Sequence, residues 1–206
     1  MFVAVALTSV IPLTASAQIK KHKVTRKALN HTSATKEEDS IVSFNFNVNS
    51  DGNLNPKGNE EIFYIATFRG KTSSQLYNNI MINIARLYRS PETVTEKIQD
   101  KMIIVNGYAK DVTRYEYIYD GYQTSGVISL DYRLTFEFKD GKIKIECPNI
   151  TEVTQFSYIL GRKNKWPKSY LGEICLKDKN AKDKVEKYFN TLIANLVYGE
   201  RKAEDW

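Results

Sequence analysis

The sequence predicts an α+β domain, and two patterns of apolar residues support this fold class. Apolar residues recur at helical spacing within 76–88 and 181–196, whereas the segments before and between them have the alternating or continuous apolar pattern of strands. The order strands, helix, strands, helix is typical of domains whose helices pack on one face of an antiparallel sheet. The 206 residues are enough for one such domain.

The first seventeen residues have the pattern of a secretory signal peptide. An uncharged apolar run, 2–13, precedes the small-residue cleavage motif Ala15-Ser16-Ala17, although no basic residue precedes the run. This run is shorter than the about 20 apolar residues that span a bilayer, and no other run approaches that length. We therefore expect an exported chain that begins at Gln18, has no transmembrane segment, and lies in the periplasm or outside the cell.

Residues 18–40 are predicted to form a basic, disordered arm, because the segment has few large apolar residues with which to order itself. Five basic residues of the arm account for five of the six formal positive charges of the chain: Lys20, Lys21, Lys23, Arg26 and Lys27. The remaining domain, 41–200, is nearly neutral, so no nucleic-acid partner is expected. Binding of polyanions through the arm stays open as an alternative.

Two strands are expected before the first helix. Residues 41–48 alternate, and the apolar side consists of Val42, Phe44, Phe46 and Val48. A polar loop with turn residues up to Gly58 follows. The continuous apolar run 62–68 then predicts a buried strand, which Gly70 ends.

The first helix begins with a capping box, Thr72 and Gln75, whose side chains satisfy each other's backbone donors. The apolar stripe is Leu76, Tyr77, Ile80, Met81, Ile84, Leu87 and Tyr88. We interpret this stripe as a face that packs on the sheet rather than as a ligand-binding face. Pro91 is expected to stop the helix.

Strands return between 93 and 150, with candidates at 102–108, 115–119, 127–138 and 142–147. The dipeptide Asp140-Gly141 predicts a solvated two-residue hairpin turn, so 132–138 should pair antiparallel with 142–150. Residues 151–178 are predicted to be a long excursion with one strand. A C-terminal helix, 179–198, follows from the spacing of its apolar residues, with Gly199 at its end.

Two cysteines remain, Cys147 and Cys175, and their state is left open between two alternatives. In an oxidising compartment they could form a disulfide. Cys147 continues the apolar face of Ile143 and Ile145, whereas Cys175 is out of phase with its neighbours, which favours two separate half-buried thiols.

The middle of the chain resembles a known family in three motifs: 70–77 opening a helix, 103–107, and 134–142 around the Asp-Gly turn. The family consists of exported bacterial proteins, a domain of unknown function with a TBP-like (TATA-box-binding-protein-like) fold. The resemblance covers about 60–150 and implies a curved antiparallel sheet with helices on one face. It implies no activity and no site residues. Asn83 and Ile143 depart from the pattern, since the family tends to have aromatic residues there.

Several chemistries lack the residues that they need. Both histidines, His22 and His31, lie in the predicted arm, so the domain has no histidine base and no recognisable zinc ligand set, and no metal or cofactor is expected. Carboxylate pairs remain, for example Glu60 with Glu61 or Asp131 with Glu137. An envelope hydrolase that uses such a pair is therefore the alternative function.

Tyrosines form the most suggestive binding feature. Tyr115, Tyr117 and Tyr119 project from one face of a strand, and Tyr122 is close by. Such rows stack on sugars or hold peptides, but they also suit simple cross-strand packing. The function expected from the sequence is a non-enzymatic binding or scaffolding domain of the bacterial cell envelope, with a glycan, peptide or protein as its partner.

Overall fold

The computed structural model describes residues 42–58, 61–158 and 160–199. These residues belong to one unit, Glu37–Trp206, and the predicted leader and arm lie outside them. The strands are β1 (Phe46–Val48), β2 (Leu54–Pro56), β3 (Phe63–Thr67), β4 (Thr95–Ile98), β5 (Met102–Tyr119), β6 (Tyr122–Lys139), β7 (Lys142–Glu146), β8 (Asn149–Ser157) and β9 (Arg162–Trp166). The helices are α1 (Ser73–Leu87), α2 (Pro91–Val94), α3 (Lys168–Lys177) and α4 (Lys179–Tyr198).

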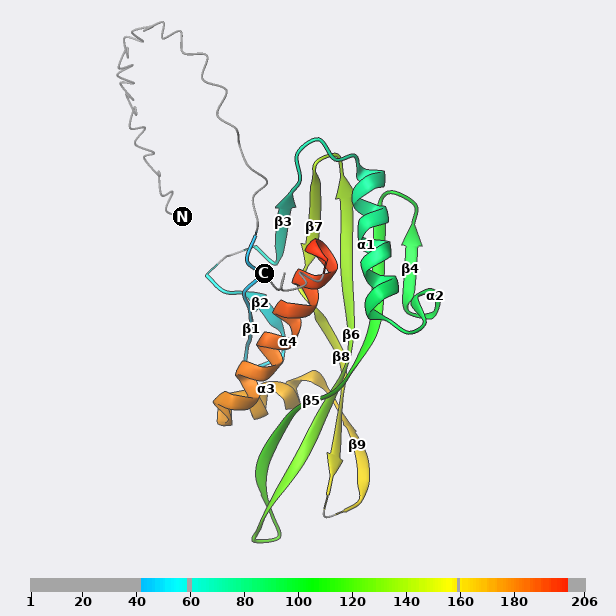
Figure 1. The fold of residues 1–206 in the computed structure, drawn as a ribbon. Helices are drawn as coiled ribbons and strands as arrows, with labels where there is room; N and C mark the ends of the chain where they lie inside the picture. Colours follow the sequence, from blue (N-terminus) through cyan, green and yellow to red (C-terminus); the bar gives the residue numbers. More distant parts are fainter. Residues whose placement is uncertain (1–41, 59–60, 159, 200–206) are drawn as a thin grey trace, which may run out of the picture. The chain divides into compact units, whose positions relative to one another are not determined.

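Seven strands form one antiparallel sheet, and β1 pairs with β2 in a separate two-stranded sheet. The main path runs β3-β7-β6-β5-β4, and β8 joins β6 to β9 (Figure 1). Strand β6 pairs with β7 through 136–139 and with β8 through 126–133, so its two halves have different neighbours. Helices and an antiparallel sheet in one domain confirm the predicted α+β class.

The centre of the sheet is a long hairpin of β5 and β6, each of 18 residues. Its turn is Asp120-Gly121, and both residues have positive φ, 48° and 79°, as a two-residue hairpin turn favours. The separate strands expected at 102–108, 115–119 and 127–138 are therefore parts of one continuous ribbon. A register shift between Ala109 and Thr113 interrupts β5, which explains why its pattern looked like two strands.

The inner face of the sheet is the face that the helices cover. Helix α1 packs on β6 and β7, and α4 packs on β5, β1, α1 and α3. The predicted helical stripes are buried or partly buried in this core. Asn83 is part of the contact between the helices, because its amide donates to Leu196 O at 2.9 Å. Tyr132 of β6 lies over Gly107 of β5, where a Cβ would come within 2.3 Å of its ring.

The β1–β2 hairpin packs against α3 and α4. Phe46 N donates to Asn190 Oδ1 at 2.7 Å, and Val48 N donates to Glu186 Oε1 at 2.9 Å. The predicted alternation is confirmed, since Phe44, Phe46 and Val48 are buried. Strand β1 is shorter than the predicted 41–48; it pairs with β2 on one edge, and side chains of α4 accept these two backbone N–H groups on the other.

The prediction of a buried strand at 62–68 is wrong in its burial, because β3 is an edge strand. It pairs only with β7, so one edge and one face lack strand or helix cover. Ala66 is buried, whereas Ile62 is 72% exposed and Ile65 is 47% exposed.

Residues 151–178 contain more structure than the one strand that we expected. Strands β8 and β9 form a hairpin, and α3 follows. Strand β9 is mostly polar, and α3 has Pro167 at its N-cap position without a side-chain cap, so neither has a strong local signal.

The hairpin turn at Asp140-Gly141 is confirmed, since Lys139 pairs with Lys142. It is more than a solvated turn, because Asp140 Oδ1 accepts a hydrogen bond from Ser73 N at 2.8 Å. The turn therefore caps the first turn of α1, which has no acidic residue of its own.

Candidate functional site

The structure does not bring the four predicted tyrosines together on one open surface. Tyr115 is 7% exposed on the inner face, where its hydroxyl bonds to the Tyr170 hydroxyl of α3, and its burial raises its pKa. Tyr117 is half-buried and bonds to Ser157 Oγ at 3.0 Å. Tyr122 is 72% exposed at the hairpin tip, and the Tyr119 side chain lies outside the described residues. A binding role for this row stays a prediction.

Of the carboxylate pairs named for the hydrolase alternative, the structure describes both members only of Asp131 with Glu137, and these two do not form a close pair. Glu60 lies outside the described residues. Asp131 and Glu137 are six residues apart on β6, which places them about 20 Å apart, whereas glycosidases need about 5–9.5 Å. Glu137 forms an ion pair with Lys144 at 2.7 Å. Asp131 lies opposite Glu152, and burial first and Glu152 second raise its pKa.

Both cysteines are free thiols, so the structure does not adopt the disulfide alternative. Cys147 is half-buried, and its Sγ donates to Ile62 O at 2.9 Å. Burial, and next the Glu146 carboxylate, raise the pKa of Cys147 to about 11. Cys175 is buried in α3, and burial raises its pKa to about 12. Both stay protonated at neutral pH, which makes them poor nucleophiles.

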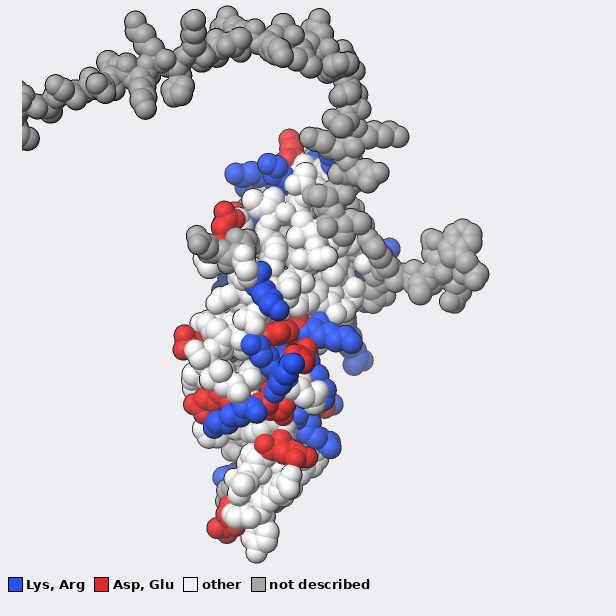
Figure 2. Space-filling view, turned by 90° about the vertical axis from the view of Figure 1, so that its left-hand side faces the viewer, with Lys and Arg blue, Asp and Glu red and all other residues white. Residues whose placement is uncertain are grey.

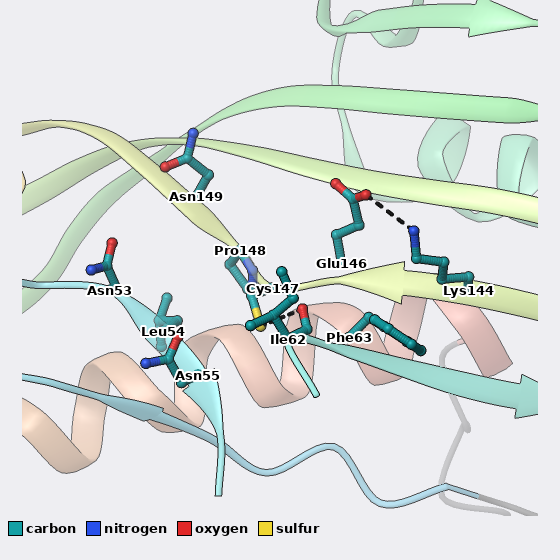
Figure 3. A pocket seen from close by; sticks show the side chains of 10 residues that line it. All are labelled: Asn53, Leu54, Asn55, Ile62, Phe63, Lys144, Glu146, Cys147, Pro148 and Asn149. Carbon is teal, nitrogen blue, oxygen red and sulfur yellow. Dashed lines mark hydrogen bonds and ion pairs between the residues drawn. The ribbon is translucent and has the colours of Figure 1, made fainter. Parts of the chain in front are cut away.

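A pocket of about 440 Å³ lies between β2 and the edge of the main sheet; we call it the β2–β7 pocket. Figure 3 shows β2 on one side of it and the β3, β7 and β8 segments on the other. It is lined by Asn53, Leu54, Asn55, Ile62, Phe63, Lys144, Glu146, Cys147, Pro148 and Asn149. The break between β7 and β8 at Cys147-Pro148 turns the chain here, because proline cannot donate a ladder hydrogen bond.

The chemistry of the β2–β7 pocket is mostly apolar with a few polar groups. Leu54 is buried, and Phe63 and Pro148 add apolar surface, while the amides of Asn53, Asn55 and Asn149 supply donors and acceptors (Figure 3).

Lys144 is not a free cation in this pocket. It bonds to Glu137 at 2.7 Å and to Glu146 at 3.4 Å, and the hydrogen bond to Glu137 is the main reason that its pKa is raised. Because two carboxylates balance the charge of the Lys144 ammonium, the site suits a ligand that has an apolar group beside hydrogen-bonding groups.

Sequence reasoning missed this pocket because its residues come from three distant segments. Asn53 and Asn55 fell within the predicted polar loop, Ile62 within a predicted buried strand, and Pro148 within the segment 142–150 that was expected to pair with 132–138. The one sequence signal for the pocket was Asn53-Leu54-Asn55, in which two amides flank an apolar residue.

A second hollow, of about 330 Å³, lies on the outer face, which is the face opposite the helices. It surrounds the bulge of β5, where Asp111 has φ 52° and its backbone N–H donates to Ser129 Oγ at 3.0 Å. Tyr108 and Tyr158 are its aromatic walls, and Arg114 covers the Tyr158 ring at 5.2 Å. It is more polar than the β2–β7 pocket.

The charges of the described surface are mixed in sign. Figure 2 shows Lys and Arg side chains interspersed with Asp and Glu side chains on the face that it draws. Within the described ranges, no helix is long and apolar enough to cross a membrane. Among the same residues, His, Cys, Asp and Glu side chains form no group of three that could hold a metal ion.

Comparisons with known proteins return two solved structures. No protein-family model matches the chain, and no curated protein matches it. The chain is similar to a TBP-like protein from Parabacteroides distasonis ATCC 8503, at 14% identity and a TM-score of 0.45, over 72% of this chain and 98% of that one. It is also similar to a DUF4468 family protein from Bacteroides ovatus ATCC 8483, at 12% identity and a TM-score of 0.38, over 75% of this chain and 91% of that one. The first description names a TBP-like protein, and the second names a family of unknown function.

Proposed function

We propose that the chain is an exported, non-enzymatic binding protein of the bacterial cell envelope, and that its ligand occupies the β2–β7 pocket. The observation that carries this proposal is the pocket itself, which joins apolar surface from Leu54 and Phe63 to three side-chain amides. The leader pattern of residues 1–17 supports export.

The size and composition of the pocket fit binding better than catalysis. Its volume of about 440 Å³ lies in the range of small-ligand sites, which is about 300–1,000 Å³. Its titratable groups are Lys144 and Glu146, which pair with each other, and a Cys147 thiol with a raised pKa. Such groups suit the holding of a ligand, because carboxylates engage the Lys144 ammonium and burial raises the pKa of the Cys147 thiol.

Export is tested by expressing the full chain with a C-terminal tag in a Gram-negative host and fractionating the cells. We expect the tagged chain in the periplasm or the medium, and N-terminal sequencing should begin at Gln18. A chain that stays in the cytoplasm with residues 1–17 attached would overturn the envelope assignment.

Binding is tested by thermal unfolding of Gln18–Trp206 against glycans, cell-wall fragments, peptides and polyanions. A ligand that binds only the folded chain adds about 2.7 kcal/mol of stability at a concentration of 100 times its Kd. We expect one class to raise Tm, and we expect Ile62→Asp to abolish that rise, because Ile62 lines the pocket and is 72% exposed.

The matched control is Ile118→Asp at the hairpin tip, where the isoleucine is 77% exposed. It should leave the ligand-induced rise in Tm unchanged. Equal responses of the two variants would show that the ligand binds elsewhere. A response to polyanions alone, lost at high salt, would support the alternative of binding through the basic arm.

A further inference from the structure

The outer edge of β3 carries backbone groups that the main sheet does not use. Ile62 and Phe68 form hydrogen-bonded pairs with β7, since Cys147 N donates to Ile62 O and Phe68 N donates to Gly141 O. Hydrogen-bonded pairs alternate along an antiparallel ladder, so Tyr64 and Ala66 also face β7. The N–H and C=O groups of Phe63, Ile65 and Thr67 therefore point away from β7. Among the described residues, no backbone group bonds to this edge.

Strand β3 also lacks the devices that protect sheet edges from pairing. Its sequence is Phe-Tyr-Ile-Ala-Thr, without a charge, a proline or a bulge. The other short outer strands are charged: β4 has Glu96 and Lys97, and β9 has three basic residues. An uncharged edge with exposed isoleucines is a template for another strand.

The two ends of β3 differ in chemistry. The β2–β7 pocket lies at its N-terminal end, where Ile62 and Phe63 form part of the lining. Exposed lysines lie at its C-terminal end, since Thr67 pairs with Lys142, and Lys71 O accepts from Gly141 N at 2.8 Å. The Asp140 carboxylate beside them is engaged by Ser73 N. An incoming strand thus meets an apolar pocket at one end and positive charge at the other.

We propose that the outer edge of β3 pairs with an extended segment of a partner protein by antiparallel strand addition. Acidic residues at the N-terminal end of that segment lie beside Lys71 and Lys142, and an apolar side chain near its C-terminal end enters the β2–β7 pocket. This inference rests on the proposed function and names its ligand class. Main-chain hydrogen bonds supply affinity, and the pocket supplies specificity.

A second copy of the chain fits this edge less well. Stable interfaces use about 20–30 residues from each partner and bury more than about 1,000 Å². The edge offers five residues, which extend over about 17 Å. A short peptide segment needs no more than this edge and the adjoining pocket.

The test selects random decapeptides, displayed on phage, against Gln18–Trp206. We expect selected peptides to combine acidic residues near their N-terminus with alternating apolar residues. Ile65→Pro removes an outward N–H at a position where an edge strand tolerates proline, and it should weaken peptide affinity at least about tenfold. Ile65→Thr keeps that N–H and β propensity, so it should change affinity less than about threefold.

A peptide-side control does not depend on how the variants fold. N-methylation of alternate peptide amides removes either the donors that face β3 or those that face away. Methylation of the amides that face β3 should abolish binding, and methylation of the amides that face away should leave binding intact.

The outcomes separate this inference from the proposed function. Equal effects of the two methylated sets, together with equal affinities of the two Ile65 variants, would overturn strand addition. If Ile62→Asp still abolished binding in that case, the β2–β7 pocket would stand. A dimer that Ile65→Pro dissociates in sedimentation, or a selection without binders, would also overturn the partner segment.

Discussion

Strands β3 and β9 are both outer strands of one sheet, yet their exposed surfaces differ. Strand β9 consists of Arg162–Trp166, with three basic residues, and Lys165 forms an ion pair with Glu152 at 2.8 Å. Strand β3 is uncharged and exposes Ile65. Charges on an edge strand discourage pairing with other chains. The difference indicates that the sheet is protected from strand addition at β9 and open to it at β3.

The largest effect is expected from Gly172→Ala, at the contact between α3 and the β1–β2 hairpin, which lies beside the pocket at the end of β3. A Cβ at Gly172 of α3 would lie 2.0 Å from Ser50 O, in the β1–β2 hairpin that carries one wall of the β2–β7 pocket. We expect a loss of about 3 kcal/mol in the free energy of unfolding, measured by urea titration, because backbone must move to relieve the overlap.

The matched control for this substitution is Ser169→Ala, at an exposed position of the same helix. It should change the free energy of unfolding by less than about 0.5 kcal/mol. Equal stability of the two variants would show that α3 and the hairpin have room to separate.

Exchanging the charged and apolar side chains of β3 and β9 tests whether edge charge prevents strand addition, with a smaller effect on stability. Ile65→Lys gives β3 a charge, and the double variant Lys163→Ile, Lys165→Ile removes two from β9. Each change should shift the free energy of unfolding by less than about 0.5 kcal/mol. Light scattering during slow heating should show less aggregation for Ile65→Lys and more for the double variant. The same aggregation in both variants would show that edge charge does not govern pairing here.

The smallest effect is expected from Asp131→Asn, next to the β8–β9 side of the sheet. Burial and Glu152 raise the pKa of Asp131, so its protonated form is favoured on folding. This contribution to stability is complete below the ordinary pKa of aspartate, about 4, and is lost as pH rises through the raised pKa.

Asp131→Asn, which stays uncharged, should therefore have a slightly higher Tm than the natural chain at pH 7 and an equal Tm near pH 3. The control is Asp183→Asn at an exposed position on α4, which makes the same substitution away from Glu152. A lower Tm for Asp131→Asn at pH 7 would mean that the carboxylate makes a net favourable contact, for example with Lys165.

The parts of the fold that were predictable have strong local signals. Helix α1 has a capping box at Thr72 and Gln75 that the structure contains, and α4 ends at Gly199 with φ 80°. The Asp140-Gly141 turn has its signal in two adjacent residues. The same signal at Asp120-Gly121 went unused because residues 122–126, which follow it, lack an alternating apolar pattern.

The parts that were not predictable depend on neighbours that are distant in sequence. Helix α3 was missed because its buried residues Leu171, Ile174 and Cys175 mix with glycine and charges, and Cys175 seemed out of phase only on a strand pattern. Tyr115 was expected on an open face, yet α3 covers it. The β2–β7 pocket could not be predicted because Leu54 belongs to a different sheet from the segments of Ile62 and Cys147, so only tertiary packing brings the three together.

The long β5–β6 hairpin has a consequence for the order in which the chain folds. Its pairs are local in sequence, so they can zip from Asp120-Gly121 without closing a long loop. Strand β3 must instead find β7 about 80 residues away, and Phe46 must find Asn190 across 144 residues. We therefore expect these contacts to form after the hairpin, and we expect both walls of the β2–β7 pocket to exchange their amide hydrogens before the hairpin does. A partner strand bound to β3 would then stabilise β3 and the walls of the pocket. It would slow amide hydrogen exchange there before it slowed exchange in the hairpin.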